Sequence, residues 1–341
     1  MRRLVTVAPG RVEVQDGPEP TPGPHEALIA IEAVGICGSD IHLFTGEHPY
    51  SHFPNVQGHE FAGRVLSLPP DYAGPAHVGD RVAVEPLLMC GECLPCRRGR
   101  GNCCLQMRTY GAQIDGALAE RLAVRAGLLH PTGELSAPLA ALVEPMSIGL
   151  QAIARSGMTP HDTVVVFGAG PIGQAVLLGA TDLGARVLVV DRLPSRLQLA
   201  LRLGAEIVVD ASTGDPREAI RDWTGGDGPV IVVEATGVPA VVEQAIDVVA
   251  SSGTVVVVGL SRQSVSVPMV ELTRKELTIV GSRNNMGRFA DAVSLVRRKP
   301  DLAGLLISHR FPLEQAPEAF ALAHDRPQAT EKVIIDVGVL A

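Results

Sequence analysis

The sequence lacks any uninterrupted apolar run of 18 residues or more, and no apolar segment follows the two arginines near its start, Arg2 and Arg3. A helix needs about 20 apolar residues to cross a bilayer, and a signal peptide needs an apolar stretch of roughly 7–15 residues behind its positive charges. The sequence therefore predicts neither a membrane span nor an export signal. We expect a cytoplasmic protein.

An excess of positive charge is also missing. The chain carries 29 Lys and Arg against 37 Asp and Glu, which gives a formal net charge of −8. Such a chain does not favour nucleic acid or an anionic membrane surface as a partner. Internal repeats and low-complexity segments are absent as well. At 341 residues the chain exceeds the ~250–300 residues that a single core supports, so we expect two domains.

The six cysteines occur without an export signal, which favours metal ligation over disulfide bonds. Cys90, Cys93 and Cys96 follow one another at Cys-x-x-Cys spacing, and Cys103 and Cys104 come shortly after. Steps of this length let one loop surround a tetrahedral zinc ion, and four thiolates leave no position open for a substrate. The segment therefore predicts a structural zinc site. Spacing alone does not separate Cys103 from Cys104 as the fourth ligand.

A zinc ribbon that grips nucleic acid is a second interpretation of these cysteines. Three nearby arginines support it: Arg97, Arg98 and Arg100. The acidic chain and the absence of a second Cys-x-x-Cys pair weigh against it. A third interpretation, unligated surface thiols, leaves the regular spacing unexplained.

Residues 35–60 hold a second set of metal-ligand types. Cys37, His59 and Glu60 supply a thiolate, an imidazole and a carboxylate, which are the side-chain groups that zinc accepts. Ser39 and His42 lie between them, and a hydroxyl and an imidazole beside a metal can carry a proton away from the reacting oxygen. The alternative is a buried thiol among surface histidines, which must then explain all of these residues within one short stretch.

His59 and Glu60 are neighbours in the sequence. Adjacent side chains on a strand point to opposite faces, so both reach one metal only where the backbone bends. Gly58 and Gly63 are the residues that permit such a bend.

The pattern of apolar and polar residues changes near the middle of the chain. The first part alternates short apolar–polar segments with Pro and Gly clusters, which is typical of β-strands. From Thr163 onward, apolar strands alternate with helical stretches, and this pattern predicts a parallel sheet covered on both faces. The expected strands of this sheet are 163–167, 186–190, 206–209, 230–234, 254–259 and 277–281.

The first of these strands runs into the glycine-rich segment 168–173, and a helix follows. Gly168 makes the tight turn, Gly170 lets the backbone approach a pyrophosphate, and Gly173 allows close helix packing. The helix begins with Pro171 and Ile172, and its N-terminus offers backbone N–H groups from Ile172 onward to the phosphates, since Pro171 has none. The segment therefore predicts a dinucleotide site, whereas glycines used only as turns would need no such context.

Asp191 ends the next strand, 18 residues after Gly173. A carboxylate there accepts hydrogen bonds from the adenosine ribose and repels a 2′-phosphate, so NAD is favoured over NADP. Arg192 and Arg196 stand against this preference because either could face a phosphate. Ligands bind at the carboxyl ends of parallel strands, so the loops there are further cofactor candidates. Their residues are Ala235, Thr236, Gly237, Val258, Gly259 and Leu260.

Cys-Gly-Ser-Asp-x-His followed by Gly-His-Glu resembles the zinc-containing medium-chain dehydrogenases, in the branch of the sorbitol, threonine and sugar-acid enzymes. The likeness extends over nearly the whole chain. It implies an α/β protein with a discontinuous, β-rich GroES-like catalytic domain, residues 1–146 and 286–341, and a Rossmann NAD-binding domain, a doubly wound parallel sheet, at 147–285. It also implies a homo-oligomer, either a dimer or a tetramer.

The resemblance implies roles for single residues too. The family spacing Cys-x2-Cys-x2-Cys-x7-Cys selects Cys104 and leaves Cys103 aside. Glu144 takes the place of the family's fourth protein group at the catalytic metal, directly or through water. A helix-start glutamate before a proline is the competing interpretation of Glu144. Arg196 falls beside the adenosine half of the cofactor. Ser282 and Arg283 fall in a segment that faces the cofactor and the substrate in relatives, which makes them further cofactor candidates.

Taken together, the residues and the resemblance predict a zinc-dependent, NAD-linked alcohol dehydrogenase with its active site between two domains. Zinc lowers the pKa of the substrate hydroxyl, the proton leaves through Ser39 toward His42, and a hydride passes to the nicotinamide. A non-catalytic member of the same fold is the rival, but no ligand or relay residue is missing.

The substrate is expected to be a secondary alcohol within a polyol or a sugar acid. This prediction rests on the polar residues expected around the substrate, which are Glu60, Arg108, Arg283, Asn284 and Asn285. Unpaired polar groups in a pocket for a simple alkanol would each cost ~1–3 kcal/mol. A threonine-like amino alcohol or a cyclitol is the alternative.

Overall fold

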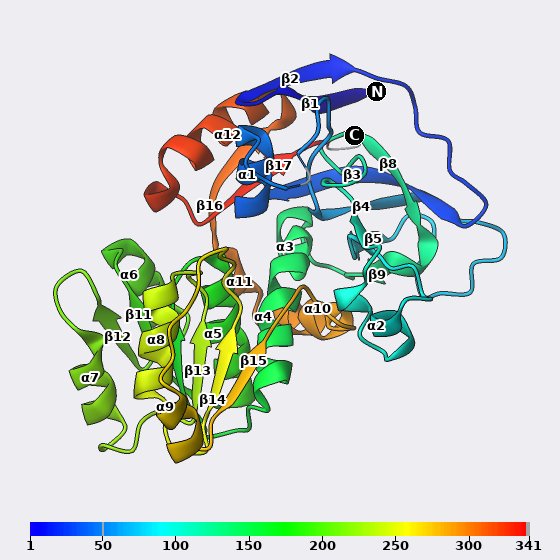
Figure 1. Ribbon diagram of the computed structural model, residues 1–341. Helices are drawn as coiled ribbons and strands as arrows, with labels where there is room; N and C mark the ends of the chain where they lie inside the picture. The colour runs from blue at the N-terminus through cyan, green and yellow to red at the C-terminus, as the bar shows by residue number, and fades with distance from the viewer. Residues whose placement is uncertain (50, 339–341) are drawn as a thin grey trace. The chain divides into compact units, whose positions relative to one another are not determined.

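The computed structural model describes residues 1–49 and 51–338. Contacts divide the chain into one unit of Met1–Glu144 with Phe289–Ala341 and a second unit of Pro145–Arg288 (Figure 1). Residues 339–341, with which the predicted first domain ends, lie outside the described part. Each unit has its own large sheet.

The first unit is built on a seven-stranded sheet whose central strand is the long β3. Strand β3 is antiparallel to β4, β8 and β17, and β16 runs parallel to β17 at one edge. Segments from both ends of the chain therefore share one sheet. The strands are β3 (Glu26–Ile36), β4 (Glu60–Ser67), β5 (Arg81–Val84), β8 (Arg121–Arg125), β9 (Leu129–Pro131), β16 (Ile307–Pro312) and β17 (Lys332–Asp336).

The strand register brings three distant segments to one end of this sheet. Gly35 on β3 pairs with Glu60 on β4, and the adjacent Ile36 pairs with Val333 on β17. Glu60 and Lys332 begin their strands, and Cys37 follows directly after β3. The C-terminal strand is therefore part of the same neighbourhood as residues 35–60.

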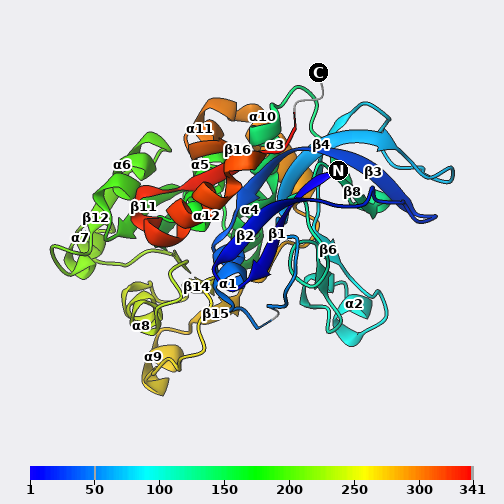
Figure 2. The same ribbon diagram turned by 90° about the horizontal axis from the view of Figure 1, so that it is seen from above.

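Smaller elements surround this sheet. Helix α12 packs beside α1 (Figure 2). The ring centroids of Phe44 and Phe320 lie 5.5 Å apart. The remaining elements of the unit are β1 (Arg2–Ala8), β2 (Arg11–Asp16), α1 (Gly38–Thr45), β6 (Leu87–Leu88), α2 (Leu94–Arg97), β7 (Arg108–Thr109), α3 (Ala137–Ala141), α10 (Phe289–Arg298), α11 (Pro300–Gly304) and α12 (Ala316–Asp325), with short 3-10 turns at Gly101–Cys103, Ala126–Leu128, Leu313–Gln315 and Pro327–Ala329.

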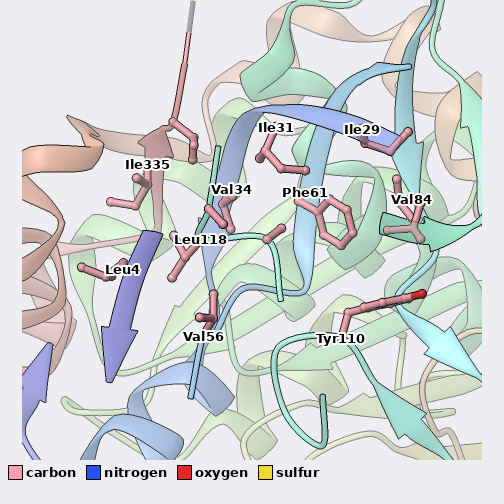
Figure 3. Close-up of a cluster of buried hydrophobic side chains, with 14 of the residues drawn as sticks. Leu4, Ile29, Ile31, Val34, Val56, Phe61, Val84, Tyr110, Leu118 and Ile335 are labelled. Carbon is pink, nitrogen blue, oxygen red and sulfur yellow. The ribbon is translucent and has the colours of Figure 1, made fainter. Parts of the chain in front are cut away.

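The core of the first unit lies along β3. Figure 3 shows Ile29, Ile31 and Val34 of this strand among side chains of the neighbouring strands and loops, including Phe61 and Leu118. Each of these five side chains is at most 2 % exposed. Burying such a side chain stabilises a fold by about 1.5–3 kcal/mol, so β3 is a rigid support for the residues at its end.

The second unit is a six-stranded, fully parallel sheet in the order β12-β11-β10-β13-β14-β15. This sheet confirms the predicted fold class. Its central strands are nearly continuous runs of buried valines, as expected for strands covered on both faces. The strands are β10 (Thr163–Phe167), β11 (Arg186–Asp191), β12 (Ile207–Asp210), β13 (Ile231–Glu234), β14 (Thr254–Val257) and β15 (Thr278–Gly281).

Helices alternate with these strands, and they are α5 (Pro171–Leu183), α6 (Pro194–Arg202), α7 (Pro216–Trp223), α8 (Pro239–Val248) and α9 (Met269–Arg274). Strand β14 ends at Val257, two residues before the predicted end at Gly259. Val258–Leu260 therefore belongs to the loop that follows.

The stretch Ala137–Ser156, which includes α3 and α4 (Val143–Ser156), is long and apolar enough to cross a membrane by length and composition. However, 67 % of its most apolar window is buried within the fold. Glu144 lies in it and is itself 8 % exposed. These are the properties of a core helix, so the stretch gives no support for a membrane span.

Candidate active site and metal centres

Cys37 is positioned by the turn that follows β3. It caps the N-terminus of α1, and its backbone N–H donates to the Asp40 carboxylate at 2.9 Å. Asp40 is 1 % exposed. A buried carboxylate that accepts a backbone N–H holds the first turn of the helix in place. The Cys37 thiol is therefore presented by a fixed turn between a strand and a helix.

Gly58 provides the bend before His59 and Glu60. Its φ is +97°, and a Cβ atom there would lie 2.8 Å from Cγ1 of Val34. Only glycine adopts this conformation without strain in so little space. Gly63 has a different role, because a Cβ there would overlap the backbone carbonyl of Ala30 on the paired strand. Gly63 allows close strand approach, whereas Gly58 has the positive φ directly before His59.

The bend and the strand register bring the three predicted ligands together. One ligand atom from each of Cys37, His59 and Glu60 lies within 4.8 Å of the others. Zinc is bound at about 2.0–2.3 Å by such sulfur, nitrogen and oxygen atoms, so neighbouring ligands of one ion fall within this separation. The donor set and its spacing fit a zinc ion.

His59 is oriented by Asp40. Its Nδ1 lies 3.4 Å from the Asp40 carboxylate, and its Nε2 lies 3.5 Å from Oγ of Ser39. Burial alone would lower the pKa of His59, but the charges and hydrogen bonds of Asp40 and Cys37 outweigh it and raise the pKa well above its usual value. The same anions favour a metal cation here. A carboxylate behind a ligating histidine also fixes which ring nitrogen faces the metal.

Glu60 has a partner that sequence reasoning missed. Both of its carboxylate oxygens lie 2.6 Å from Nζ of Lys332, which also donates to the Ile36 carbonyl at 3.3 Å. The two side chains are 1 % and 3 % exposed. Gly35 makes room for the pair, because a Cβ there would overlap Oε2 of Glu60. Lys332 lies 272 residues from Glu60, so no local motif could have revealed it.

Glu60 and Glu144, the two carboxylates predicted near the metal, are both buried. Glu60 was expected at the metal and among the polar side chains around the substrate, and its carboxylate is paired with Lys332. Glu144 lies in the first turn of α4 and stands outside the group of three ligand atoms. The pKa of Glu144 is raised to about 7, mainly because burial disfavours its charged form; His59 and Lys332 oppose this rise, and Glu60 adds to it. Glu144 is therefore close enough for the charged groups of the site to shift its pKa.

The two residues of the predicted proton relay differ in position: Ser39 lies beside the candidate metal ligand His59, and His42 is exposed to solvent. The hydroxyl of Ser39 lies beside His59, whereas the ring of His42 lies 3.3 Å from Glu47 and its side chain is 64 % exposed. Both residues belong to the first two turns of α1. His42 is thus placed to exchange protons with water, and Ser39 is the member of the pair that touches a ligand.

Four of the six cysteines form a second cluster. The sulfur atoms of Cys90, Cys93, Cys96 and Cys104 lie within 4.8 Å of one another, with measured separations of 3.5, 3.8 and 4.0 Å. A tetrahedral ion with sulfur ligands at about 2.3 Å has sulfur–sulfur edges of about 3.8 Å. The cluster has the dimensions of a closed zinc site. Cys103 is outside the group.

Backbone groups in this cluster point at sulfur. The N–H of Cys90 and the N–H of Gln106 each lie 3.3 Å from Sγ of Cys104, and the N–H of Cys93 lies 3.4 Å from Sγ of Cys90. Hydrogen bonds from backbone N–H groups lower the pKa of Cys93 to about 6, whereas burial and the neighbouring thiols raise the pKa of Cys96 to about 12. Thiols this close resist losing all their protons unless a cation joins them.

The glycine-rich segment forms the turn from β10 into α5. Gly168 has a φ of +95°, and a Cβ on Gly173 would overlap the carbonyl oxygen of Gly168. Any larger residue at 173 would push the helix away from the turn. Gly170 caps α5 with an extended backbone, so the first N–H groups of a 13-residue helix are open toward a ligand.

Asp191 lies at the end of β11 and ties two loops together. Its Oδ2 accepts from the N–H of Ala169 at 2.6 Å, and its Oδ1 accepts from the N–H groups of Arg192 and Leu193 at 2.7 and 2.9 Å. A guanidinium nitrogen of Arg196 approaches the Cβ position of Gly170 at 3.6 Å, while Arg192 is exposed. Asp191 and Arg196 are therefore both next to the glycine-rich turn.

The remaining cofactor candidates lie in loops at the carboxyl ends of the strands. Gly237 and Gly259 pack backbone to backbone, and Leu260 beside them is 95 % exposed. After β15, Ser282 is 9 % exposed and Asn285 is fully buried, whereas Arg283 is exposed. Arg108, from the other unit, is exposed on β7. The loops after β13 and β14 are thus in contact with each other.

Comparisons with known proteins agree with this geometry. Residues 23–134 match the alcohol dehydrogenase GroES-like domain, and residues 171–298 match the zinc-binding dehydrogenase domain. The chain is 35 % identical over 303 residues to L-galactonate-5-dehydrogenase of Escherichia coli K12, with 88 % of each chain covered. It is also 35 % identical over 328 residues to sorbitol dehydrogenase of Ovis aries, covering 93 % of this chain and 91 % of the relative.

Solved structures are similar over almost the whole chain. The short chain alcohol dehydrogenase rspB of Escherichia coli CFT073, complexed with NADH, has a TM-score of 0.91 at 29 % identity and covers 99 % of both chains. A structure from Sinorhizobium meliloti bound to NADP has a TM-score of 0.90 at 30 % identity, covering 98 % of this chain and 99 % of the other. The chain belongs to the zinc-type medium-chain alcohol dehydrogenases, as its motifs predicted. It is accordingly an alcohol dehydrogenase.

Proposed function

We propose that this protein is a zinc-dependent oxidoreductase that transfers a hydride from a secondary alcohol of a polyol or a sugar acid to NAD. The observation that carries the proposal is the group of Cys37, His59 and Glu60, whose ligand atoms lie within 4.8 Å of one another, with Asp40 behind the histidine. Two named relatives act on L-galactonate and on sorbitol, a sugar acid and a polyol, which supports the same substrate class here.

The chain's own residues would bind and orient the reactants. Cys37, His59 and Glu60 would hold the catalytic zinc, and Glu144 would stand near it. Zinc supplies Lewis-acid polarisation of the alcohol, and the nicotinamide ring accepts the hydride. Asp40 keeps Nδ1 of His59 engaged and thereby leaves Nε2 to face the metal.

Ser39 and His42 would move the proton. The hydroxyl of Ser39 lies beside His59, where it can accept a proton from the substrate alcohol, and the exposed ring of His42 can pass it to water. The second zinc, on Cys90, Cys93, Cys96 and Cys104, would hold the loop in shape without taking part in the reaction.

The experiment that tests this function measures reduction of NAD against a panel of polyols, aldonates, threonine, cyclitols and primary alkanols. We expect activity on polyols or aldonates, together with loss of activity when Cys37 is replaced by Ser. A preference for primary alkanols would overturn the substrate class, and turnover without zinc would overturn the mechanism. No reduction with any alcohol in zinc-loaded protein would favour a non-catalytic role.

Arg283 is our candidate for a substrate carboxylate, because a guanidinium binds a carboxylate with two parallel hydrogen bonds. Replacing Arg283 with Met is expected to lower kcat/KM for an aldonate by about 10–100-fold, with little change for the matching polyol. Arg202→Met, an exposed arginine on α6, is the control. Equal losses for both substrates would instead assign Arg283 to the cofactor.

Asp191 is our candidate for selecting NAD over NADP. Asp191→Ala should raise KM for NAD by about tenfold. It should also raise kcat/KM for NADP relative to that for NAD, because the carboxylate that repels the 2′-phosphate is gone. The loss of an acceptor for three backbone N–H groups should also lower the melting temperature. The ratio of the two kcat/KM values measures the effect. A wild-type preference for NADP would contradict this assignment and point to Arg192 or Arg196.

A cytoplasmic homo-oligomer is the assembly we propose. Strand β15 is at an edge of the six-stranded sheet, and several exposed apolar side chains lie on it and in the segment before it. An open strand edge flanked by apolar surface is suited to pairing with a second copy. These side chains are Leu260, Val265, Met269, Val270 and Ile279.

A further inference from the structure

Glu234 is a buried carboxylate that belongs to neither of the two candidate metal sites. It ends β13 and is 0 % exposed. Its Oε1 accepts from the N–H of Thr236 at 2.6 Å and from the N–H of Gly237 at 2.8 Å, and the Thr236 hydroxyl donates to the same oxygen. Its Oε2 has no hydrogen-bond partner among the described residues. Three donors therefore converge on one oxygen of this side chain.

The backbone of Glu234 holds a second loop. Its carbonyl accepts from the N–H of Val258 at 2.9 Å and from the N–H of Gly259 at 3.2 Å. The carboxylate thus organises the loop after β13, and the carbonyl organises the loop after β14. Both loops lie at the carboxyl ends of neighbouring parallel strands, where ligands bind in sheets of this kind.

The loops are packed so closely that only glycine fits between them. A Cβ on Gly259 would overlap the backbone nitrogen of Gly237 and would lie 2.8 Å from Oε2 of Glu234. A Cβ on Gly168, in the glycine-rich turn, would lie 2.8 Å from Cγ2 of Thr236. The glycine-rich turn and the loops after β13 and β14 therefore meet around the side chains of Glu234 and Thr236.

We infer that Glu234 is a positioning residue for the nicotinamide half of the cofactor, an inference that rests on the proposed function. By fixing Thr236, Gly237 and the Val258–Gly259 peptide before the cofactor arrives, Glu234 removes loop-ordering entropy from the binding step. A charged oxygen holds three donors more firmly than a neutral one. The buried, unpartnered Oε2 is unfavourable for folding alone, and such exceptions occur where function requires them.

A purely structural role is the alternative, because Glu234 also supports the start of α8. Oγ1 of Thr236 accepts from the N–H of Val238, which caps that helix. The two roles differ in what they predict for cofactor fragments. ADP-ribose carries the adenosine and both phosphates, which the glycine-rich turn and Asp191 would contact, but it has no nicotinamide. If Glu234 is only structural, its replacement should disorder the whole unit and weaken the binding of NADH and of ADP-ribose alike. If Glu234 positions the nicotinamide half, its replacement should weaken the binding of NADH selectively.

The test measures dissociation constants of NADH and ADP-ribose for the wild type and for Glu234→Gln by calorimetry. The amide keeps the shape of the side chain but removes the charge that draws three donors. We expect NADH to bind about tenfold more weakly and ADP-ribose to change by less than about twofold. Glu218→Gln, the same chemical change at an exposed position on α7, should leave both constants unchanged.

Two results would overturn the inference: equal weakening of both ligands, or NADH binding as in the wild type. If Glu234→Gln fails to fold, Thr236→Val is the second variant. It removes the hydroxyl that donates to Glu234 and that accepts from the N–H of Val238, and it leaves the Glu234 carboxylate in place. This variant should weaken NADH by about threefold and spare ADP-ribose, and equal effects on both would again contradict the inference. Failure of the wild type to bind NADH at all would count against the proposed function instead, so the two failures are distinguishable.

Discussion

Replacing Lys332 with Met is expected to lower the free energy of unfolding of the metal-free protein by about 3–5 kcal/mol. The reason is that Lys332 donates to both oxygens of Glu60 at 2.6 Å, with the two side chains 3 % and 1 % exposed. Removing the ammonium leaves a buried carboxylate without its cation. A carboxylate in that position must either remain charged at high cost or take up a proton.

A double-mutant cycle checks the origin of this loss. Glu60→Gln in the Lys332→Met background should recover much of the stability, because no buried charge remains. Arg310→Met is the matched control, since Arg310 and Asp336 form an exposed ion pair between the neighbouring strands β16 and β17. That variant should cost about 0–1 kcal/mol. Similar small losses for Lys332 and Arg310, measured by denaturant unfolding after chelation, would contradict the assignment.

Replacing Cys104 with Ala is expected to remove one of two zinc ions per chain and to lower the thermal unfolding temperature sharply. Four sulfur atoms at 3.5–4.0 Å have the dimensions of a closed site, and structural zinc contributes folding free energy directly. Apparent zinc binding in small structural sites is worth about 10–16 kcal/mol, so a lost ligand should cost several kcal/mol.

The chain supplies its own control for this experiment. Cys103 is adjacent to Cys104 in the sequence but lies outside the sulfur cluster. Cys103→Ala should therefore retain two zinc ions and unfold as the wild type does. Elemental analysis of purified protein and a thermal melt give both measurements. Equal zinc loss from the two variants, or full zinc content in Cys104→Ala, would show that the cluster does not hold the metal.

Residues near one another in the sequence were the predictable part of the candidate site. Cys37, Ser39 and His59 fall within one short stretch, and the glycines at 168–173 fall within another. A metal ion or a pyrophosphate is bound by several groups that lie close together in one short segment of the chain. The residue spacing in each set is therefore typical of that binding function and of few others. The same spacing carried the family resemblance, which the comparisons confirmed.

Asp40 and Lys332 could not be recognised in this way. Asp40 was visible within a motif, but its role appears only when β4 brings His59 to within 3.4 Å of it. Lys332 has no motif around it and reaches Glu60 because β17 and β4 flank the same end of β3. The sequence placed Glu60 at the metal but did not reveal its pairing with Lys332. The burial of Glu60 against Lys332 is a consequence of strand register, which local sequence does not encode.

The order of residues along the chain was sufficient to predict the two classes of architecture, the ligand types and the dinucleotide turn. These features depend on short-range periodicity and on the chemistry of side chains a few positions apart. Tertiary structure alone established that Lys332 neutralises Glu60 and that Glu234 fastens two loops. Each of these depends on which segments distant in sequence become neighbours, and that choice is made by the burial of whole strands and helices in the cores.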